Sequence, residues 1–198
     1  MKMISVAQRT PEWYAARAGK PTASGFDRIV TSDGKPSKQA QKYMYQLAGE
    51  KILGMPEETY QNAAMQRGVE LEAEARQYYE LVTGTTVQEV GFCLDDTESF
   101  GCSPDGLVGE DGLIEIKCPS LAVHVDYLLR GALPSDYIQQ VQGQLLVTGR
   151  KWCDFVSYYP GIRPLVVRVA RNEDFIKKLS VELELFCADL KTVINKIQ

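Results

Sequence analysis

Histidine is almost absent from this chain, because His124 is the only one among its 198 residues. A zinc site built on several histidines therefore finds no support, and a Ser-His-Asp triad would have to use this one residue. We interpret His124 as a structural or surface residue. The sequence also lacks any C-x-x-C pair among its five cysteines. We expect reduced, mostly buried thiols, as in a cytoplasmic protein, instead of a disulfide framework.

Long apolar runs are missing as well. No stretch is apolar for long enough to span a bilayer, and the N-terminal MKMISVAQRT has no signal-peptide core. We therefore expect a cytoplasmic protein without a membrane partner.

Nor is there an excess of positive charge, since the net charge is −4. That value does not by itself indicate a protein that binds nucleic acid. The charges are unevenly spread, however: residues 1–51 carry nine Lys or Arg against four Asp or Glu, and the remainder has a net charge of −9. Acidic residues at a metal site would account for part of this asymmetry, and a protein that encircles its ligand can combine an acidic outside with a basic channel. The alternative is that the asymmetry has no functional meaning.

The most informative stretch is residues 103–119, which read SPDGLVGEDGLIEIKCP. The segments at 103–106 and 109–112 are rich in the residues that favour tight turns. A short apolar run follows each of them, at 107–108 and at 113–118. This pattern predicts a β-hairpin.

The predicted hairpin gathers charged side chains on one patch. Strand alternation directs Ile114 and Ile116 toward a core and leaves Glu115 and Lys117 together on the opposite face. The hairpin brings Asp105 near them. Two carboxylates suit a hard cation such as Mg²⁺, and the Lys can orient or deprotonate water or stabilise charge on a phosphate. The alternative is a surface hairpin with a solvated Glu–Lys pair, which fits less well because the pair interrupts an apolar strand.

Capping residues, chain breakers and hydrophobic periodicity predict the remaining elements. Helices are expected over residues 11–17, 22–30, 37–53, 62–83, 120–130, 136–148 and 172–197, and β-rich segments over 85–94, 152–159 and 165–169. This order predicts an α/β protein with a central mixed β-sheet flanked by helices, organised as one domain over residues 1–198.

Two of these helices carry more specific expectations. The core candidates of the helix over 37–53 are Tyr43, Leu47 and Ile52. The buried stripe of the helix over 62–83 is expected to contain Leu71, Ala75, Tyr78 and Val82. Glu72 lies at the edge of that stripe, where a carboxylate can face a cation site, whereas Glu70 and Glu74 are expected in solvent.

Arg17 precedes a predicted helix start that carries Thr22 and Ser24. A guanidinium, two hydroxyls and free backbone N–H groups can together bind an anion. Ordinary capping of the helix by Thr22 or Ser24 is the simpler alternative.

Several of these segments resemble one known family. Pro104-Asp105 followed at hairpin distance by Glu115-Ile116-Lys117 resembles the PD-(D/E)xK nuclease signature. With the strings R-x-G-x-x-T-A-S, R-G-x-E-x-E-x-E-A-R and Y-x-x-Q-x-Q, the chain resembles the phage lambda exonuclease family, the YqaJ-type viral recombinases, from about Gln8 to Arg150. The resemblance implies a restriction-endonuclease-like core. It also implies a Mg²⁺-dependent exonuclease that digests one strand of duplex DNA in the 5′ to 3′ direction.

The resemblance assigns expected roles at the cation site. Asp105, Glu115 and the Ile116 carbonyl would hold one Mg²⁺, for which Mn²⁺ is a substitute, and Glu72 would bind a second ion. Lys117 would activate water or stabilise the transition state. The resemblance further implies that Gln140 lies near the metal site, supported by Tyr137 and Gln142.

The resemblance also implies contacts with a DNA end. Arg17, Thr22, Ser24 and Ser103 would bind a 5′-terminal phosphate. Met65 matches an apolar position that the family places against the splitting end of the duplex, although a plain core methionine fits the sequence equally well.

Partners and biological context follow from the resemblance alone. It implies a ring of three identical subunits, encoded by a phage or prophage in a bacterial host. Release of 5′-mononucleotides would leave 3′ single strands for recombination with a single-strand annealing protein. Two alternatives stay open: another PD-(D/E)xK enzyme, acting as an endonuclease, and a non-catalytic protein that binds DNA ends.

Overall fold

The computed structural model describes residues 1–56 and 63–198. Its main sheet is mixed, because β6 runs parallel to β7 while the other neighbours are antiparallel. The five strands, in spatial order, are β2 (Val87–Gln88), β5 (Gly106–Val108), β6 (Gly112–Lys117), β7 (Trp152–Ser157) and β8 (Leu165–Ala170). The predicted hairpin is formed by β5 and β6, with Leu107 opposite Leu113. The predicted mixed sheet is thus confirmed.

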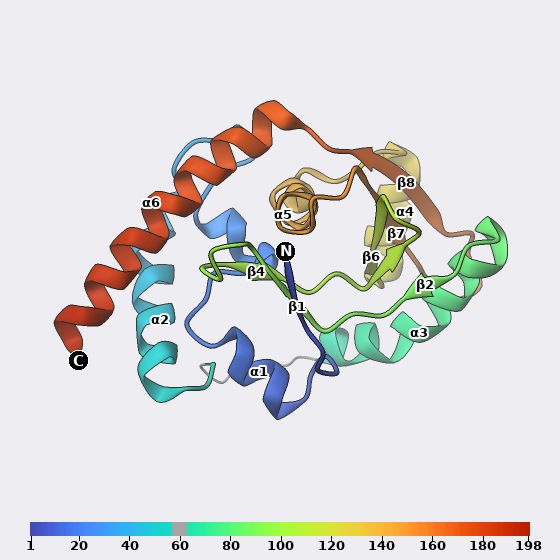
Figure 1. Ribbon diagram of the computed structural model, residues 1–198. Helices are drawn as coiled ribbons and strands as arrows, with labels where there is room; N and C mark the ends of the chain where they lie inside the picture. Colours follow the sequence, from blue (N-terminus) through green and yellow to red (C-terminus); the bar gives the residue numbers. More distant parts are fainter. Residues whose placement is uncertain (57–62) are drawn as a thin grey trace.

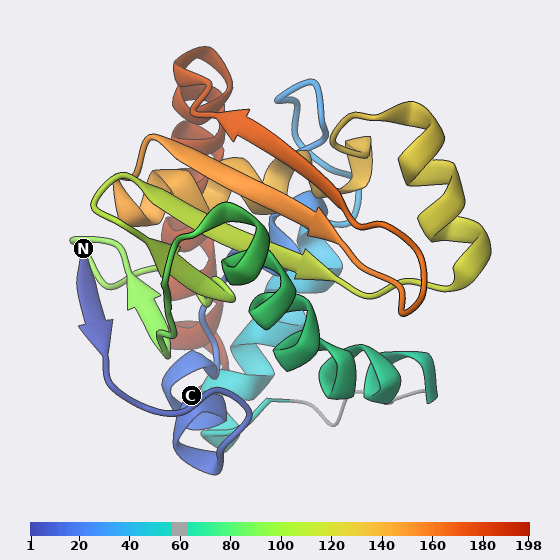
Figure 2. The same ribbon diagram turned by 90° about the vertical axis from the view of Figure 1, so that its right-hand side faces the viewer.

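Helices cover both faces of this sheet (Figures 1 and 2). On one face Leu113 packs with Val141 and Leu145 of α5 (Ile138–Thr148). On the other face Ile114 packs with Tyr79 of α3 (Ala63–Thr83). Successive residues of β6 therefore contribute to two different cores, as the alternation of side chains along a strand requires.

A further layer lies behind α5. In Figure 1, α5 is seen end-on, between the sheet on one side and α2 (Ala40–Leu53) and α6 (Glu173–Ile197) on the other. These helices share an apolar cluster with the 3₁₀ helix η1 (Ala23–Arg28). The remaining elements are α1 (Pro11–Arg17), α4 (Leu121–Arg130), the 3₁₀ helix η2 (Ser135–Tyr137), and a small sheet of β1 (Lys2–Ile4), β3 (Phe92–Leu94) and β4 (Gly101–Cys102).

Local chemistry explains where α1 begins and ends. Thr10 accepts a hydrogen bond from the Trp13 amide at 3.3 Å, and Pro11 occupies the first turn. The chain then turns at Gly19, which has a φ of +71°. A Cβ at Gly19 would lie 2.5 Å from the Cβ of Lys51, so α2 can approach this turn only because the residue is glycine.

Several predicted elements are corrected by the structure. The helix expected over 22–30 is the short 3₁₀ helix η1, the helix expected from Ser37 begins at Ala40, and the β-rich segment 85–94 divides into β2 and β3 in different sheets. Asn62, the expected start of the long helix, lies outside the described residues.

The buried stripe of α3 was predicted correctly at Ala75, which is buried, but wrongly at Tyr78 and Val82. Tyr79 is 1% exposed, whereas Tyr78 and Val82 are exposed. The physical reason is a polar anchor, because the Tyr79 hydroxyl donates to Asp154 Oδ2 at 2.7 Å. In α2, Tyr43 and Leu47 are buried as expected, but Ile52 is exposed close to the helix end.

The rare residue types take structural positions. His124 is fully buried and its ring nitrogens lie 2.8 Å from Ser157 Oγ and 3.1 Å from the Arg163 carbonyl. All five cysteines are free thiols, three buried and two partly exposed. Within the described residues, no helix has both the length and the apolar composition needed to cross a membrane.

Candidate active site

The β5–β6 hairpin fixes Asp105 against the strand that carries Glu115. Asp105 Oδ2 accepts a hydrogen bond from the Ile116 amide at 2.6 Å. The next residue, Gly106, leaves no room for a side chain, because a Cβ there would lie 2.1 Å from Val87 Cγ1. Asp105 therefore lies next to the strand that carries Glu115 and Lys117, as predicted.

Glu115 is 2% exposed and is held from two directions. Its Oε1 accepts from Gln140 Nε2 and pairs with Lys117 Nζ, each at 2.6 Å. Its Oε2 accepts from Gln144 Nε2 at 2.5 Å. Gln140 and Gln144 stand one helical turn apart on α5, so both amides reach the same carboxylate.

Of the two residues expected to support Gln140, only Tyr137 lies near the site. The centroid of its ring is 5.1 Å from Lys117 Nζ. Gln142 donates to the Ala170 carbonyl and accepts from the Asn172 amide, both at 2.9 Å. A residue two positions from Gln140 points away from it on a helix, which is why Gln142 holds the β8–α6 connection instead. Gln144 was missed, although its spacing of four from Gln140 was a usable signal.

The electrostatic balance of the hairpin favours a cation. Burial, followed by the carboxylates of Glu115 and Glu72, raises the pKa of Asp105 well above its ordinary value. Burial alone would lower the pKa of Lys117, but Glu115 and Asp105 together hold it above its usual range. The hairpin itself carries two carboxylates, Asp105 and Glu115, against the single ammonium of Lys117, so an added cation would relieve the repulsion between them.

The donor set fits a hard divalent cation. Asp105 and Glu115 present carboxylate oxygens at one end of the hairpin, and oxygen ligands are those that Mg²⁺ and Mn²⁺ prefer. In the part of the chain that the structure describes, no three side chains of His, Cys, Asp or Glu form a group able to enclose a metal by themselves. A backbone oxygen, for which Ile116 is the predicted source, and water would have to complete the set.

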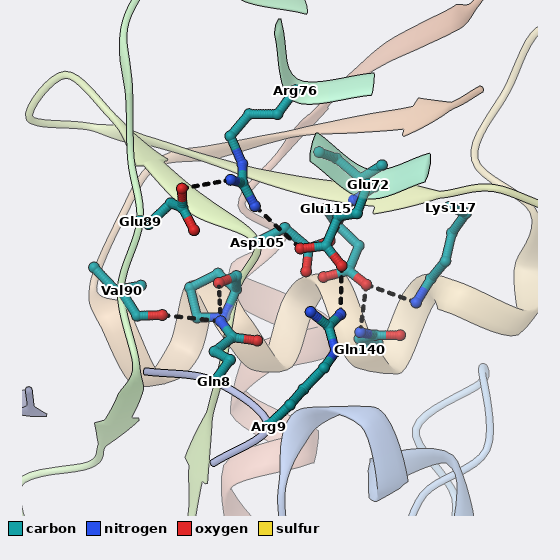
Figure 3. A network of polar contacts seen from close by, with 12 residues as sticks. Gln8, Arg9, Glu72, Arg76, Glu89, Val90, Asp105, Glu115, Lys117 and Gln140 are labelled. Atoms are coloured by element: carbon teal, nitrogen blue, oxygen red, sulfur yellow. Dashed lines mark hydrogen bonds and ion pairs between the residues drawn. The ribbon is translucent and has the colours of Figure 1, made fainter. Parts of the chain in front are cut away.

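Glu72 faces the same region from α3 but is bound by two arginines (Figure 3). Its Oε1 accepts from Arg76 Nη2 at 3.0 Å, and its Oε2 contacts Arg9 Nη2. Arg76 is also paired with Glu89 at 2.6 Å. Arg9 comes from the segment just before α1, and its part in the site was not predicted.

Two hollows meet at this position. The larger has a volume of about 730 Å³ and is lined on one side by Lys117, Tyr137 and Arg67. The smaller has a volume of about 450 Å³ and lies over the segment that precedes α1. Arg9, Glu72 and Asp105 line both, so the carboxylates stand where the two hollows join.

The predicted anion-binding residues converge beside the hairpin. Arg17 donates to Ser103 Oγ at 3.2 Å and to Thr22 Oγ1 at 3.3 Å, and Ser24 Oγ lies 3.3 Å from Thr22 Oγ1. Trp13, which was not predicted, stacks 3.9 Å from the guanidinium and donates to Ser103 Oγ at 2.9 Å. Because η1 is only a short 3₁₀ helix, the guanidinium and hydroxyls would carry this site, and not a helix N-terminus.

The Arg17 guanidinium is largely removed from solvent in this position. Burial lowers the pKa of Arg17, although nearby groups, among them the Glu50 carboxylate, act in the opposite direction. Because burial still outweighs these contributions, an anionic ligand would stabilise the guanidinium further. Ser103 stands two residues before Asp105, so the same turn contributes to the anion pocket and to the cation site.

The other predicted residues of α3 are placed as follows. Glu70 and Glu74 are exposed, as expected, and Glu74 accepts from the Tyr158 hydroxyl at 2.5 Å. Met65 belongs to α3, but its side chain lies outside the described residues. Its predicted contact with a DNA end is therefore not addressed by the geometry.

Comparisons with known proteins identify a family and structurally similar exonucleases. The family model of the YqaJ-like viral recombinase domain matches residues 12–151. The structure of an alkaline exonuclease, LHK-Exo, from Laribacter hongkongensis is similar with a TM-score of 0.87 and 41% sequence identity, covering 95% of this chain and 96% of that one. LHK-Exo in complex with dAMP gives a TM-score of 0.86 at the same identity and coverage.

A more distant structure shares the fold. A phage-related exonuclease from Haemophilus somnus 129PT is similar with a TM-score of 0.73, at 18% identity, covering 90% of this chain and 96% of that one. At this identity the similarity concerns the fold alone. A comparison with curated proteins found no match.

Proposed function

The chain belongs to the YqaJ-like viral recombinase family, as its motifs indicated, and from this premise we propose that it is a Mg²⁺-dependent exonuclease that degrades duplex DNA from 5′ ends. One observation carries the proposal. The turn from Ser103 to Asp105 contributes one residue to a buried arginine–hydroxyl pocket and another to a carboxylate–lysine patch. A strand held by its terminal phosphate in the first would present a nearby phosphodiester to the second.

The proposed reaction is hydrolysis of that phosphodiester. A water oxygen bonds to phosphorus, the bond to the O3′ of the terminal nucleotide breaks, and a proton reaches this leaving oxygen. The product is a 5′-mononucleotide, and the strand keeps a new 5′ phosphate. When bound, a divalent cation supplies charge stabilisation for the phosphate and lowers the pKa of water.

The protein's own residues have distinct proposed parts. Asp105 and Glu115 hold the cation, together with the Ile116 carbonyl. Gln140 and Gln144 keep the Glu115 carboxylate oriented, which their hydrogen bonds to opposite oxygens support. Lys117, paired with Glu115 on the cleft side, donates to an oxygen on which negative charge develops.

Direction would come from the anion pocket. An internal phosphodiester carries about one negative charge and a terminal phosphate nearly two near neutral pH, by analogy with phosphorylated side chains. Arg17 with the hydroxyls of Thr22, Ser24 and Ser103 therefore favours a terminus. Each cut creates another such terminus, which would draw the strand forward.

Assembly and biological role are part of the proposal and rest on family membership. A ring of three chains would keep the enzyme on its substrate, and the remaining 3′ single strand would pass to an annealing protein. In this proposal residues 1–198 act as one nuclease domain, and Mn²⁺ can replace Mg²⁺.

Digestion of linear duplexes labelled at either the 5′ or the 3′ end of one strand tests the proposal. With Mg²⁺, we expect early release of the 5′ label as a mononucleotide and retention of the 3′ label, and no release without the cation. Cutting of closed circular DNA would indicate an endonuclease. Binding of ends without any release, with either Mg²⁺ or Mn²⁺, would indicate a non-catalytic end-binding protein.

A further inference from the structure

Arg9 has an unusual backbone that the surrounding structure enforces. Among the described residues other than glycine, only Arg9 and Glu98 have a positive φ, which is +67° at Arg9. The preceding residue is anchored, because Gln8 Nε2 donates to the Val90 and Pro104 carbonyls at 2.9 Å. The following residue, Thr10, caps α1. Strained conformations that are fixed on both sides are concentrated at functional sites.

The strained backbone aims the Arg9 side chain at Glu72 (Figure 3). Its guanidinium contacts Glu72 Oε2, and within the described chain this is the one ion pair that Arg9 makes. The side chain is nevertheless 42% exposed and lines both hollows.

Arg76, the second cation on Glu72, is held quite differently. Its side chain is 14% exposed and is shared between Glu72 and Glu89. Arg76 therefore has two carboxylate partners and little access to solvent, whereas Arg9 has one partner and an open cleft. Of the two arginines, Arg9 is the one that can leave Glu72 without losing a second ion pair.

We propose that Arg9 is a displaceable counter-ion of Glu72, which gives way when a divalent cation binds there and then donates to a backbone phosphate of the DNA strand in the cleft. The inference rests on the proposed function. A guanidinium covering Glu72 Oε2 and a cation at the same oxygen exclude each other, both by space and by like charge. Once released, the guanidinium fork suits two phosphate oxygens.

This arrangement predicts two effects of opposite sign. Removing the Arg9 guanidinium uncovers Glu72, so divalent cations should bind more tightly in the absence of DNA. The same change removes a phosphate contact, so DNA should bind more weakly in the presence of the cation. A purely structural role for the Arg9–Glu72 pair would not strengthen one affinity while weakening the other.

Two substitutions distinguish the effect of the Arg9 guanidinium from the effect of its strained backbone. Arg9→Gln removes the charge and keeps a side chain of similar reach. Arg9→Gly removes the side chain and accepts a positive φ without strain, so its fold is retained even if Gln destabilises the turn. Arg67→Gln is a matched control, because Arg67 lines the same cleft but contacts Tyr159 and the Pro119 carbonyl and not Glu72.

Titration calorimetry with Ca²⁺ alone measures the first effect. We expect both Arg9 variants to bind Ca²⁺ about two- to fivefold more tightly, the range for loss of one partly exposed ion pair. Arg67→Gln should bind Ca²⁺ as the wild type does. Unchanged or weaker Ca²⁺ binding in both Arg9 variants would overturn the displacement.

Fluorescence anisotropy with a labelled 5′-phosphorylated duplex in Ca²⁺ measures the second effect. We expect both Arg9 variants to bind about tenfold more weakly, and the slope of log affinity against log salt to fall in magnitude by about one. Unchanged DNA affinity would overturn the phosphate contact. If the wild type binds Ca²⁺ and degrades DNA, and the Arg9 variants behave in the same way, this inference alone is refuted. If the wild type neither binds Ca²⁺ nor degrades DNA, the proposed function is refuted as well.

Discussion

At the scale of single residues, the site depends on how the hairpin carboxylates are held. Glu115 is almost completely buried and has a hydrogen-bond or ion-pair partner on each oxygen before any cation is added. Asp105 is fixed by the amide of the opposite strand. Such fixed geometry means that little has to reorganise when substrate arrives, which is the basis of electrostatic catalysis.

We predict that Asp105→Ala, Glu115→Ala and Lys117→Ala each lower the rate of Mg²⁺-dependent nucleotide release by about 10²–10³, while circular dichroism shows a folded protein. Ca²⁺ should support DNA binding with little cleavage, because its looser coordination positions the phosphate poorly. Glu110→Ala is the matched control: Glu110 is an exposed carboxylate at the tip of the same hairpin, and its removal should leave the rate unchanged. A near wild-type rate for Lys117→Ala would mean that the chemistry happens elsewhere.

Some residues of the candidate site could be predicted from the sequence, and others could not. Asp105, Glu115 and Lys117 lie on one hairpin, so turn residues and strand alternation are enough to bring them together. Gln144 could have been found by its spacing from Gln140 on one helix. Arg9 could not, because no local pattern reveals a contact between the segment before α1 and a helix more than sixty residues later.

At the scale of elements, α3 is the helix whose packing was least well predicted. After Ala75, helical periodicity fits Tyr78 as well as it fits Tyr79. Tyr79 is the buried residue because its hydroxyl donates to Asp154, a contact that hydrophobic periodicity cannot reveal. Asp154 is also paired with Arg168 of the neighbouring strand. This anchor matters for the proposed function because α3 carries Glu72, the proposed ligand of a second cation.

We predict that Tyr79→Phe lowers the free energy of unfolding by about 1–2 kcal/mol, because it removes a buried hydrogen bond to a carboxylate. The neighbouring Tyr78 is exposed, so Tyr78→Phe should change stability by less than about 0.5 kcal/mol. Urea denaturation of both variants makes the comparison. Equal effects of the two substitutions would show that α3 is not anchored through Tyr79.

Elements with strong end signals were predicted well, and those without them were not. The capped helices α1 and α6 and the β7–β8 hairpin match their expected spans closely, because Thr10, Asn172 and the Pro-Gly segment mark their limits. By contrast, residues 85–94 have β propensity throughout. Only tertiary pairing, of β2 with β5 and of β3 with β1 and β4, divides them between two sheets.

At the scale of the whole molecule, the proposed ring requires an interface between copies of the chain. Large apolar side chains stand exposed on separate helices, among them Leu81 of α3, Leu129 of α4 and Leu185 of α6. A cyclic ring repeats one interface that joins two different surfaces of the chain, and exposed apolar side chains on several helices could supply both. We expect light scattering at micromolar concentration to give three times the mass of one chain. A monomer under those conditions would contradict the ring.

The whole account centres on one claim: the Arg17 pocket holds a terminal 5′ phosphate while the neighbouring carboxylate–lysine patch hydrolyses the strand. Initial rates on linear duplexes with 5′-phosphate and with 5′-hydroxyl ends, for the wild type and Arg17→Ala, test it most directly. We predict that the wild type prefers the phosphorylated end. The Arg17→Ala protein should retain Ca²⁺ affinity but lose most of the preference, because its rate falls on phosphorylated ends. Equal wild-type rates on the two ends, or a preference that survives unchanged in Arg17→Ala, would contradict the claim and leave Arg17, Thr22 and Ser24 as structural residues only.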